Sequence, residues 1–363
     1  MISLAQSEPG IPVPVDDLDA DPELVNCVNG TLNLSTGELQ PHRQSDMITK
    51  ILSCGYKPGA RSDVWDRFLV DVTQGDAELA GYLQRVFGYA LLGAVKEKHL
   101  WFIYGPSNSG KSTFINAVFE VFGDYGRAAS FETWLTHSVI GGNRGDIVDL
   151  IGARLVTSVE VRRGAKFDEA LLKSVTGGDR VKAAAKYERE VEFTPAFTLV
   201  LAGNDAPIVR DDDDGMWTRM RRVPFSHSID ESKQDKRLGE KLKTAEVQEA
   251  ILAWLVAGYH TWKKEGIGTC KSVEKSNDEY RTEMDRVKGF FEDELEFSIE
   301  GVIPTAQLRA AYEMWASDNG VKTLHVKEFN KRLRERGCVA GKSGAVRRWN
   351  GVTLIKENNS IVK

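Results

Sequence analysis

The feature that most constrains this chain is residues 100–123, LWFIYGPSNSGKSTFINAVFEVFG, where an apolar run, a glycine-bearing loop and an amphipathic segment follow one another. Leu100–Tyr104 predicts a buried strand, because a short continuous apolar run suits a covered parallel sheet. The next residues, GPSNSGKS, match G-x-x-x-x-G-K-[ST] in full. Apolar residues at helical spacing after Lys111 predict a helix that ends at Gly123. The sequence therefore predicts an α/β core with a phosphate-binding loop.

In such a loop, backbone N–H groups and the positive end of the helix face the phosphates of a nucleotide. Lys111 is expected to reach the β- and γ-phosphates, and the Ser112 hydroxyl to hold Mg²⁺. The alternative, a glycine-rich turn that binds nothing, does not account for a strand and a helix at the required places.

Composition and charge narrow the class of protein. The 363 residues carry a net charge of −5, so any DNA contact must be local. No apolar run approaches the roughly 18–20 residues that span a bilayer, and the N-terminus does not resemble a signal peptide. The four cysteines show no C-x-x-C spacing, which favours reduced thiols over zinc or disulfides. We expect a cytoplasmic protein of two or three domains with no membrane partner.

Two further apolar runs end on polar residues. Arg154–Val159 leads to Glu160, and FTLVLAGN ends on Asn204. An acid at the carboxyl end of a strand beside a phosphate loop can hold the water shell of the metal or position the attacking water. An amide there can orient that water or sense the γ-phosphate. A surface glutamate and a turn-forming asparagine remain the alternatives.

Cations follow in two places. After a helix that ends at Thr176–Asp179, short strand-like pieces predict an exposed hairpin with Lys182, Lys186, Tyr187 and Arg189. Such a hairpin suits a phosphodiester backbone and a stacked base, and a solvated basic hairpin is the alternative. Arg219, with Arg221 and Arg222 behind it, precedes a short strand at Val223–Phe225. An arginine offered across a subunit interface to the γ-phosphate of a neighbour would stabilise transition-state charge.

The C-terminal tail is locally basic. Residues 322–348 contain nine Lys or Arg against two Glu, a net charge of +7. Over the longer tail, from Thr305 to Ile355, two helices, a glycine-bearing turn and a β-ribbon are predicted, which is the order of a winged helix. This asymmetry favours nucleic-acid binding, with a basic protein-binding face as the alternative.

Taken in order, these segments resemble the phage/plasmid and poxvirus primase-helicases of helicase superfamily 3, from about residue 25 to the C-terminus. The resemblance is carried by FIYGPSNSGKST together with VNGTLNLSTGELQPH, FGYALLG, IGARLVTSVE, LLKSVTGGD, FTLVLAGNDAP, MWTRMRRVPF and RRWNGVTL. It implies an AAA+ type core that assembles into a ring, usually a hexamer, with ATP and Mg²⁺ bound between subunits. Such rings move along single-stranded DNA and unwind forked DNA when a phage, plasmid or other mobile element replicates, in a bacterial host or at a viral replication site.

By position, the resemblance implies three groups of residues. Nucleotide binding falls on Gly105, Pro106, Ser107, Asn108, Ser109, Gly110, Lys111, Ser112 and Thr113. Catalysis falls on Lys111, Glu160 as the Walker B acid, Asn204 as the sensor and Arg219 as the finger, with Ser112 and Glu160 at the metal. DNA binding falls on Lys182, Lys186 and Tyr187 of a hairpin in the channel of the ring.

The resemblance also implies an organisation: an N-terminal arm and small hairpin region at 1–62, a helical collar at 63–98, the ATPase core at 99–230, a helical connection at 231–290 and a winged-helix DNA-binding domain at 291–363.

Three departures from the family pattern matter. Val159 and Val161 flank Glu160 where two adjacent acids are frequent, which leaves open whether Asp179 assists it. Ala184 stands where the pattern has an arginine, so that Lys182 or Lys186 must substitute. No primase domain is visible, so a separate primase is expected as a partner unless the chain is a C-terminal portion.

The sequence therefore predicts an ATP- and Mg²⁺-dependent ring helicase. One alternative is a replication initiator that binds origin DNA, uses ATP as an assembly switch and unwinds little. Another is a P-loop small-molecule kinase, which the basic tail disfavours.

Overall fold

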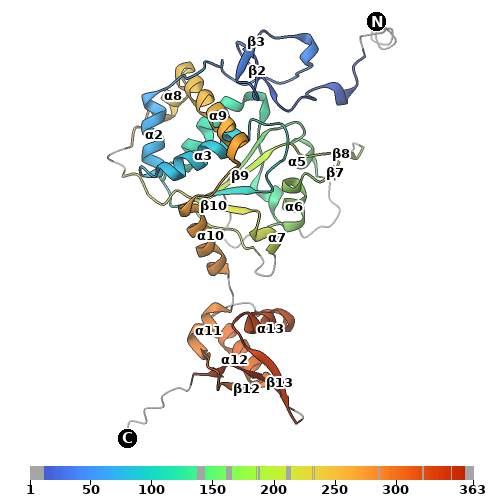
Figure 1. The fold of residues 1–363 in the computed structure, drawn as a ribbon, viewed down its shortest axis with the longest axis vertical. Coiled ribbons are helices and arrows are strands. Elements are labelled where there is room, and N and C mark those ends of the chain that lie inside the picture. The colour runs from blue at the N-terminus through green and yellow to red at the C-terminus, as the bar shows by residue number, and fades with distance from the viewer. Residues whose placement is uncertain are drawn as a thin grey trace. The chain divides into compact units, whose positions relative to one another are not determined.

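The computed structural model describes residues 12–136, 144–160, 166–184, 186, 189–209, 214–230, 232, 234–284, 287–320, 323–344 and 346–355. It divides into two compact units (Figure 1). The first unit comprises Met1–Val209 and Gly215–Asn277, and the second comprises Arg210–Asp214 and Asp278–Lys363.

A five-stranded parallel sheet forms the centre of the first unit. Its order is β10 (Met220–Pro224), β4 (Leu100–Tyr104), β9 (Thr198–Gly203), β6 (Leu155–Val159) and β5 (Gly126–Ala128). Because every neighbouring pair is parallel, all five strands end at one edge, here called the carboxyl edge, and begin at the opposite amino edge. The predicted strands at 100–104, 154–159 and 197–204 are confirmed as β4, β6 and β9, and the strand predicted at 223–225 is longer and begins at Met220.

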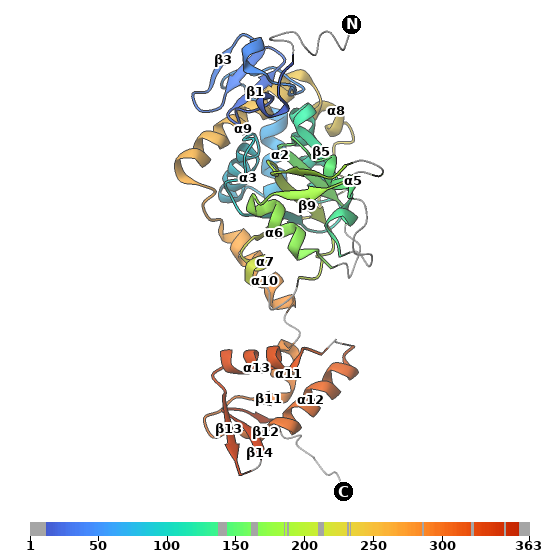
Figure 2. The same ribbon diagram turned by 90° about the vertical axis from the view of Figure 1, so that its right-hand side faces the viewer.

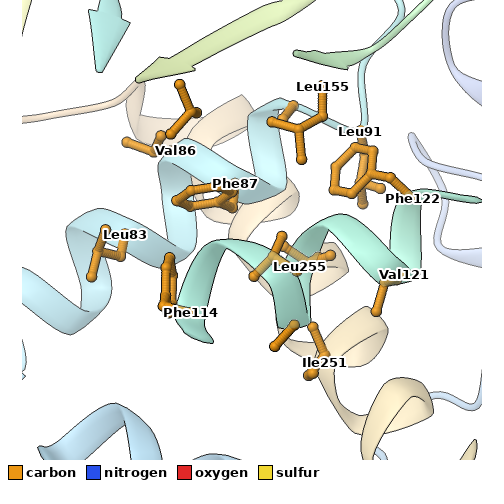
Figure 3. Close-up of a cluster of buried hydrophobic side chains, with 14 of the residues drawn as sticks. Leu83, Val86, Phe87, Leu91, Phe114, Val121, Phe122, Leu155, Ile251 and Leu255 are labelled. Carbon is orange, nitrogen blue, oxygen red and sulfur yellow. The ribbon is translucent and has the colours of Figure 1, made fainter. Parts of the chain in front are cut away.

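Helices pack against this sheet around one apolar core. They include α2 (Asp63–Thr73), α3 (Ala77–Tyr89), α4 (Lys111–Phe122) and α9 (Ala245–Glu265). In Figure 2, α3 and α9 lie alongside each other, and the Gln84 side chain donates a hydrogen bond to the Trp254 carbonyl at 3.0 Å. In Figure 3, side chains from three helices pack in one cluster: Leu83, Val86 and Phe87 from α3, Phe114, Val121 and Phe122 from α4, and Ile251 and Leu255 from α9. The helix that follows the phosphate loop is therefore anchored by its apolar face.

A small antiparallel sheet lies at the start of the first unit. It contains β1 (Leu24–Cys27), β2 (Gly30–Asn33) and β3 (Glu38–Gln40), where the sequence predicted a hairpin region, so the third strand was missed. The buried guanidinium of Arg154 donates hydrogen bonds to the carbonyls of Pro22, Leu24 and Leu91 at 2.6–3.1 Å. It lies over the Tyr125 ring at 4.7 Å and thereby ties this sheet to the core.

The second unit contains three helices and short antiparallel strands around an aromatic core. Its elements are α11 (Lys288–Glu294), β11 (Leu295–Glu296), β12 (Val302–Pro304), α12 (Thr305–Asp318), α13 (Val326–Glu335), β13 (Val339–Ser343), β14 (Val346–Asn350) and β15 (Thr353–Leu354). Strands β12, β14 and β13 form one sheet in that order. Phe290, Tyr312, Phe329 and Trp349 are among its buried side chains. The two helices and the ribbon predicted from the tail are present.

The remaining elements are the α-helices α5 (Gly145–Val148), α6 (Glu169–Gly177), α7 (Asp214–Trp217), α8 (Leu238–Leu242) and α10 (Lys271–Met284), the strands β7 (Val181–Ala183) and β8 (Val191–Phe193), and the 3₁₀ helices Val15–Asp17, Gln44–Asp46, Gly123–Tyr125 and Phe131–Trp134. All four cysteines are buried and unpaired. Within the described part of the chain, every helix is too short or too polar to cross a bilayer.

Candidate active site

The predicted phosphate loop runs from the carboxyl end of β4 to the first turn of α4. Its shape depends on two glycines. A Cβ on Gly105 would lie 2.0 Å from the Phe225 carbonyl oxygen, so only glycine fits there. Gly110 precedes the helix with φ +84°, and a Cβ on it would lie 2.6 Å from Cγ1 of Val72. The strand, loop and helix predicted around the motif are confirmed.

Lys111 points into the loop rather than into solvent. Its ammonium donates hydrogen bonds to the carbonyls of Gly105 and Pro106 at 2.8 and 2.6 Å and to Oγ of Ser109 at 3.1 Å. The residue is buried, and burial lowers the pKa of its ammonium. A cation held by carbonyl and hydroxyl oxygens, without a carboxylate, is placed to exchange these neutral acceptors for the oxygens of an anion.

Two of the predicted catalytic residues lie at the carboxyl edge of the sheet, where the phosphate loop begins. Asn204 follows β9, and its side-chain amide donates to Oγ of Ser107 in the loop at 3.2 Å. Glu160 follows β6, and its N–H donates to the Ala202 carbonyl at 3.1 Å. Since β9 lies between β4 and β6, Asn204 stands between the loop and Glu160.

The backbone of Glu160 is unusual. Its φ of +73° lies in the left-handed region, which costs a non-glycine residue free energy and is seen most often where function demands it. The side chain is exposed at the carboxyl edge. Glu160 therefore departs from the regular strand conformation at the carboxyl end of β6.

Arg219 lies at the opposite edge. It precedes β10, and its carbonyl accepts a hydrogen bond from the N–H of Leu100, the first residue of β4. The five residues of β4 separate the two edges by about 17 Å, at about 3.3 Å per residue. Arg219 therefore does not reach Lys111 of its own chain. Its Nη1 donates to the Gly215 carbonyl at 2.7 Å, and its buried Nε has no hydrogen-bond partner among the described residues.

The two neighbouring arginines are engaged elsewhere. Arg222 is 4% exposed and stacks over the Tyr104 ring at 3.8 Å. Nη2 of Arg221 lies 2.7 Å from Nε2 of His99, and burial, with the charges of Arg221 and Arg219, lowers the pKa of His99 to about 4. Of the three arginines, Arg222 thus stacks on an aromatic ring and Arg221 contacts His99, whereas the guanidinium of Arg219 contacts the Gly215 carbonyl.

The predicted hairpin is present as β7 and β8, and it also lies at the amino edge. Helix α6 follows β6 and ends at Gly177. The next residue, Gly178, lies close to Val95, which precedes β4 in the chain: a Cβ on Gly178 would be 3.9 Å from Cβ of Val95. Asp179 is in this turn, so it is separated from Glu160 by the length of the sheet. The structure thus answers the question left open by the sequence: Asp179 does not assist Glu160 of the same chain.

Acidic side chains accompany the cations of this hairpin. Lys182 forms an ion pair with Glu190 at 3.8 Å, and Arg180 one with Glu192 at 3.5 Å. Lys186 is described and exposed, whereas Tyr187 lies outside the described residues. Glu190 and Glu192 were overlooked in the sequence, although their alternation in YEREVEF is the signal that could have revealed them.

A cavity of about 530 Å³ adjoins the phosphate loop. Its walls are α2, Ile229, residues between 234 and 241, and the loop residues Asn108, Gly110 and Thr113. The chain after β10 returns across the loop, where Oγ of Ser228 donates to the Ser107 carbonyl at 2.9 Å and the N–H of Ile229 to the Asn108 carbonyl at 2.9 Å. Sequence reasoning missed this wall, because no local pattern shows that 63–71 and 229–241 meet.

Three families match separate parts of the chain: "D5 N terminal like" at residues 1–74, a family of unknown function (DUF5906) at 103–222 and "Poxvirus D5 protein-like" at 282–337. The chain is thus similar to D5-like proteins over residues 1–74 and 282–337. Curated proteins similar to this chain include a putative helicase, L207/L206, of Acanthamoeba polyphaga mimivirus (24% identical, 77% of this chain and 31% of the relative). A putative helicase, V13, of Sputnik virophage (24% identical) covers 72% and 36%. A putative primase, C962R, of African swine fever virus (24% identical) covers 88% and 36%.

The chain thus spans about a third of the length of these curated relatives. Among solved structures, it is similar to one titled as the apo structure of the NrS-1 C-terminal region (305–718), with a TM-score of 0.48 and 14% identity over 82% of this chain and 77% of that one. The family resemblance drawn from the eight sequence segments is confirmed by the family matches and the viral relatives.

Proposed function

We propose that this chain is the ATPase motor of a DNA helicase that acts in replication of a virus, phage, plasmid or other mobile element. The observation that carries the proposal is the meeting of Lys111, Asn204 and Glu160 at one edge of the sheet, with Asn204 hydrogen-bonded to the phosphate loop. Relatives named as putative helicases or primases of viruses support the same role.

The residues present suit ATP with Mg²⁺. The two glycines leave a cradle that a Cβ would fill, and the N–H groups of α4 face it. Lys111 would bind the phosphates, and Ser112 and Glu160 would hold Mg²⁺, which supplies charge neutralisation at the phosphate oxygens. The adjoining cavity of about 530 Å³ has room for the nucleoside.

Glu160 would also polarise the attacking water, and Asn204 would sense the γ-phosphate through the loop it touches. Arg219 would complete the site of a neighbouring copy, because the sheet separates it from the loop of its own chain. We therefore propose a closed ring, with six copies as the family suggests, and expect hydrolysis to require assembly.

In this ring the hairpin β7–β8, with Lys182, Lys186 and Tyr187, would grip single-stranded DNA in the channel, and its ion pairs with Glu190 and Glu192 would hold the cations in place. We assign residues 291–363 as a winged-helix DNA-binding domain, on the order of helices and ribbon and the local charge of +7. A primase on a separate chain is the expected partner.

The test compares hydrolysis and unwinding. We expect the wild-type chain to hydrolyse ATP faster with single-stranded DNA and to separate a forked duplex, and Lys111→Ala to abolish hydrolysis. Lys264→Ala is the matched control, because this exposed lysine pairs with Glu265 at the end of α9, and it should retain both activities. ATP-dependent assembly on a specific duplex without strand separation would instead identify a replication initiator, and a wild-type chain without ATPase activity would refute the motor.

A further inference from the structure

The ribbon of the second unit carries two cations that face each other directly. Lys342 of β13 is the register partner of Arg347 of β14, and both side chains are exposed. Like charges directly opposite on neighbouring strands destabilise a sheet. Among the residues that the structure describes, neither cation has an acidic partner. The pair therefore forms a site that an anion would stabilise.

The same pair faces the helices. Arg347 and Trp349 are two residues apart on β14, so their side chains lie on the same face of the sheet. Trp349 is buried with its register partner Ile303 in the core that α12 and α13 cover. Arg347 also lines a cavity together with Val326 and Asn330 of α13. The end of the ribbon and the start of α13 thus border one cleft.

Helix α13 contributes a row of cations of its own. Lys327, Lys331 and Arg334 are exposed and lie at i, i+4 and i+7, which places them on one face of the helix. Only a long ion pair, from Lys331 to Glu335 at 3.9 Å, offsets this row within the described residues. A linear row of positive charge beside the cationic pair suits a polyanion rather than a single small anion.

The cavity between the two elements is apolar. It measures about 460 Å³ and is lined by the apolar residues Pro304, Ala306, Val326, Phe329 and Val346 and by the polar residues Thr305, Arg309, Asn330 and Arg347. Arg309 is held by Glu313 at 2.6 Å and by the Leu324 carbonyl at 2.9 Å. Among the described residues, Arg347 has no such hydrogen bond or ion pair, so it can turn toward a ligand. An apolar hollow beside a cationic pair matches a phosphate that carries a sugar and a base.

We propose that the cleft between the β13–β14 ribbon and α13 is a second nucleic-acid site, in which Lys342 and Arg347 hold one backbone phosphate from two strands and the apolar cavity receives the attached sugar or base. The row on α13 binds the phosphates that follow. The inference rests on the DNA-binding role proposed for this unit and deepens it, because it names the contacts and separates them from the hairpin of the motor.

The test measures the salt dependence of binding by the full chain. Fluorescence anisotropy with a labelled single strand and with a duplex of equal length gives the slope of log K against log salt. We expect Lys342→Ala and Arg347→Ala each to reduce the steepness of this slope by about 0.7 on the single strand or about 0.9 on the duplex, whichever the cleft binds. Lys288→Ala removes the same charge from a lysine that pairs with Glu292 on α11 and does not line the cavity, so its slope should equal the wild-type slope.

A separate variant tests the role of the cavity in binding. Ala306 is exposed, so Ala306→Trp fills the cavity without entering the core, and it should weaken binding while leaving the salt slope unchanged, because no charge is altered. Wild-type slopes in both charge variants would overturn the proposal. So would variants that bind both DNAs normally but lose binding to a polyglutamate peptide, since the cleft would then receive an acidic protein segment. The motor is judged separately, on hydrolysis and unwinding by the wild-type chain.

Discussion

Replacing Gly110 by alanine tests how closely the shape of the phosphate loop determines nucleotide affinity. Alanine at φ +84° costs about 1–2 kcal/mol relative to glycine. Its Cβ would lie 2.6 Å from Cγ1 of Val72, a stiff β-branched side chain on α2, and such overpacking costs about 1–3 kcal/mol more. If nucleotide binding requires this loop conformation, Gly110→Ala should raise the Kd for a nucleotide by about 30-fold to several thousand-fold, at 1.4 kcal/mol per factor of ten.

The companion variant separates the two costs. Val72→Ala removes the clashing methyl group. In the double variant Gly110→Ala/Val72→Ala, the loss of nucleotide affinity caused by the clash should therefore disappear, whereas the loss caused by the backbone conformation should remain. The assay is equilibrium titration of a fluorescent ATP analogue against the wild type, the two single variants and the double variant. Wild-type affinity in Gly110→Ala would refute the reasoning about the loop. Purely additive effects of the two substitutions would refute the clash.

Three further predictions concern other regions of the chain. Lys186→Ala should reduce the stimulation of ATP hydrolysis by DNA and abolish unwinding of a forked duplex; an unchanged unwinding rate would count against the hairpin. The pKa of His99 is lowered to about 4 from 6.5, so the unfolded chain binds more protons than the folded chain between these pH values, and the free energy of unfolding should fall as the pH drops through this window. Denaturation at a series of pH values measures this dependence, which His99→Gln should weaken. An identical pH profile in the variant would contradict the assignment. Arg154→Met removes the guanidinium that donates to the carbonyls of Pro22, Leu24 and Leu91, of which Pro22 keeps the N–H of Gly93 as a donor. It should cost about 3–5 kcal/mol of unfolding free energy by urea denaturation, whereas a loss below about 1 kcal/mol would show that the guanidinium does not hold the N-terminal sheet.

The parts of the fold predicted correctly are those fixed by local sequence. The strand, loop and helix around Lys111 follow from consecutive residues, so their bounds were found within a residue. The third strand of the N-terminal sheet was missed because Glu38–Gln40 is short and mostly polar, and it pairs only because β2 is already in place. The sequence of this strand alone does not predict that it forms.

The candidate site shows the same division. Asn204 and Glu160 were predicted from local sequence as residues at the ends of strands. The order of the strands, which no single segment determines, brings them beside the loop. That order also places Arg219 and Asp179 at the amino edge, so it supports a role for Arg219 in a neighbouring copy and removes Asp179 from the site. The wall formed by 229–241 depends on a return of the chain across the loop, and this return lies beyond the reach of sequence periodicity.

The central claim, that Arg219 completes the site of a neighbour, is tested most directly by mixing two inactive variants. Lys111→Ala lacks a working loop but offers Arg219, and Arg219→Ala has a working loop but lacks the finger. When equal amounts are mixed as dissociated subunits and then assembled, about one quarter of the interfaces should join an intact loop to an intact arginine, and ATPase activity should recover to about that fraction of wild type. Full activity of Arg219→Ala alone, or no recovery in mixed rings shown to contain both variants, would contradict the account.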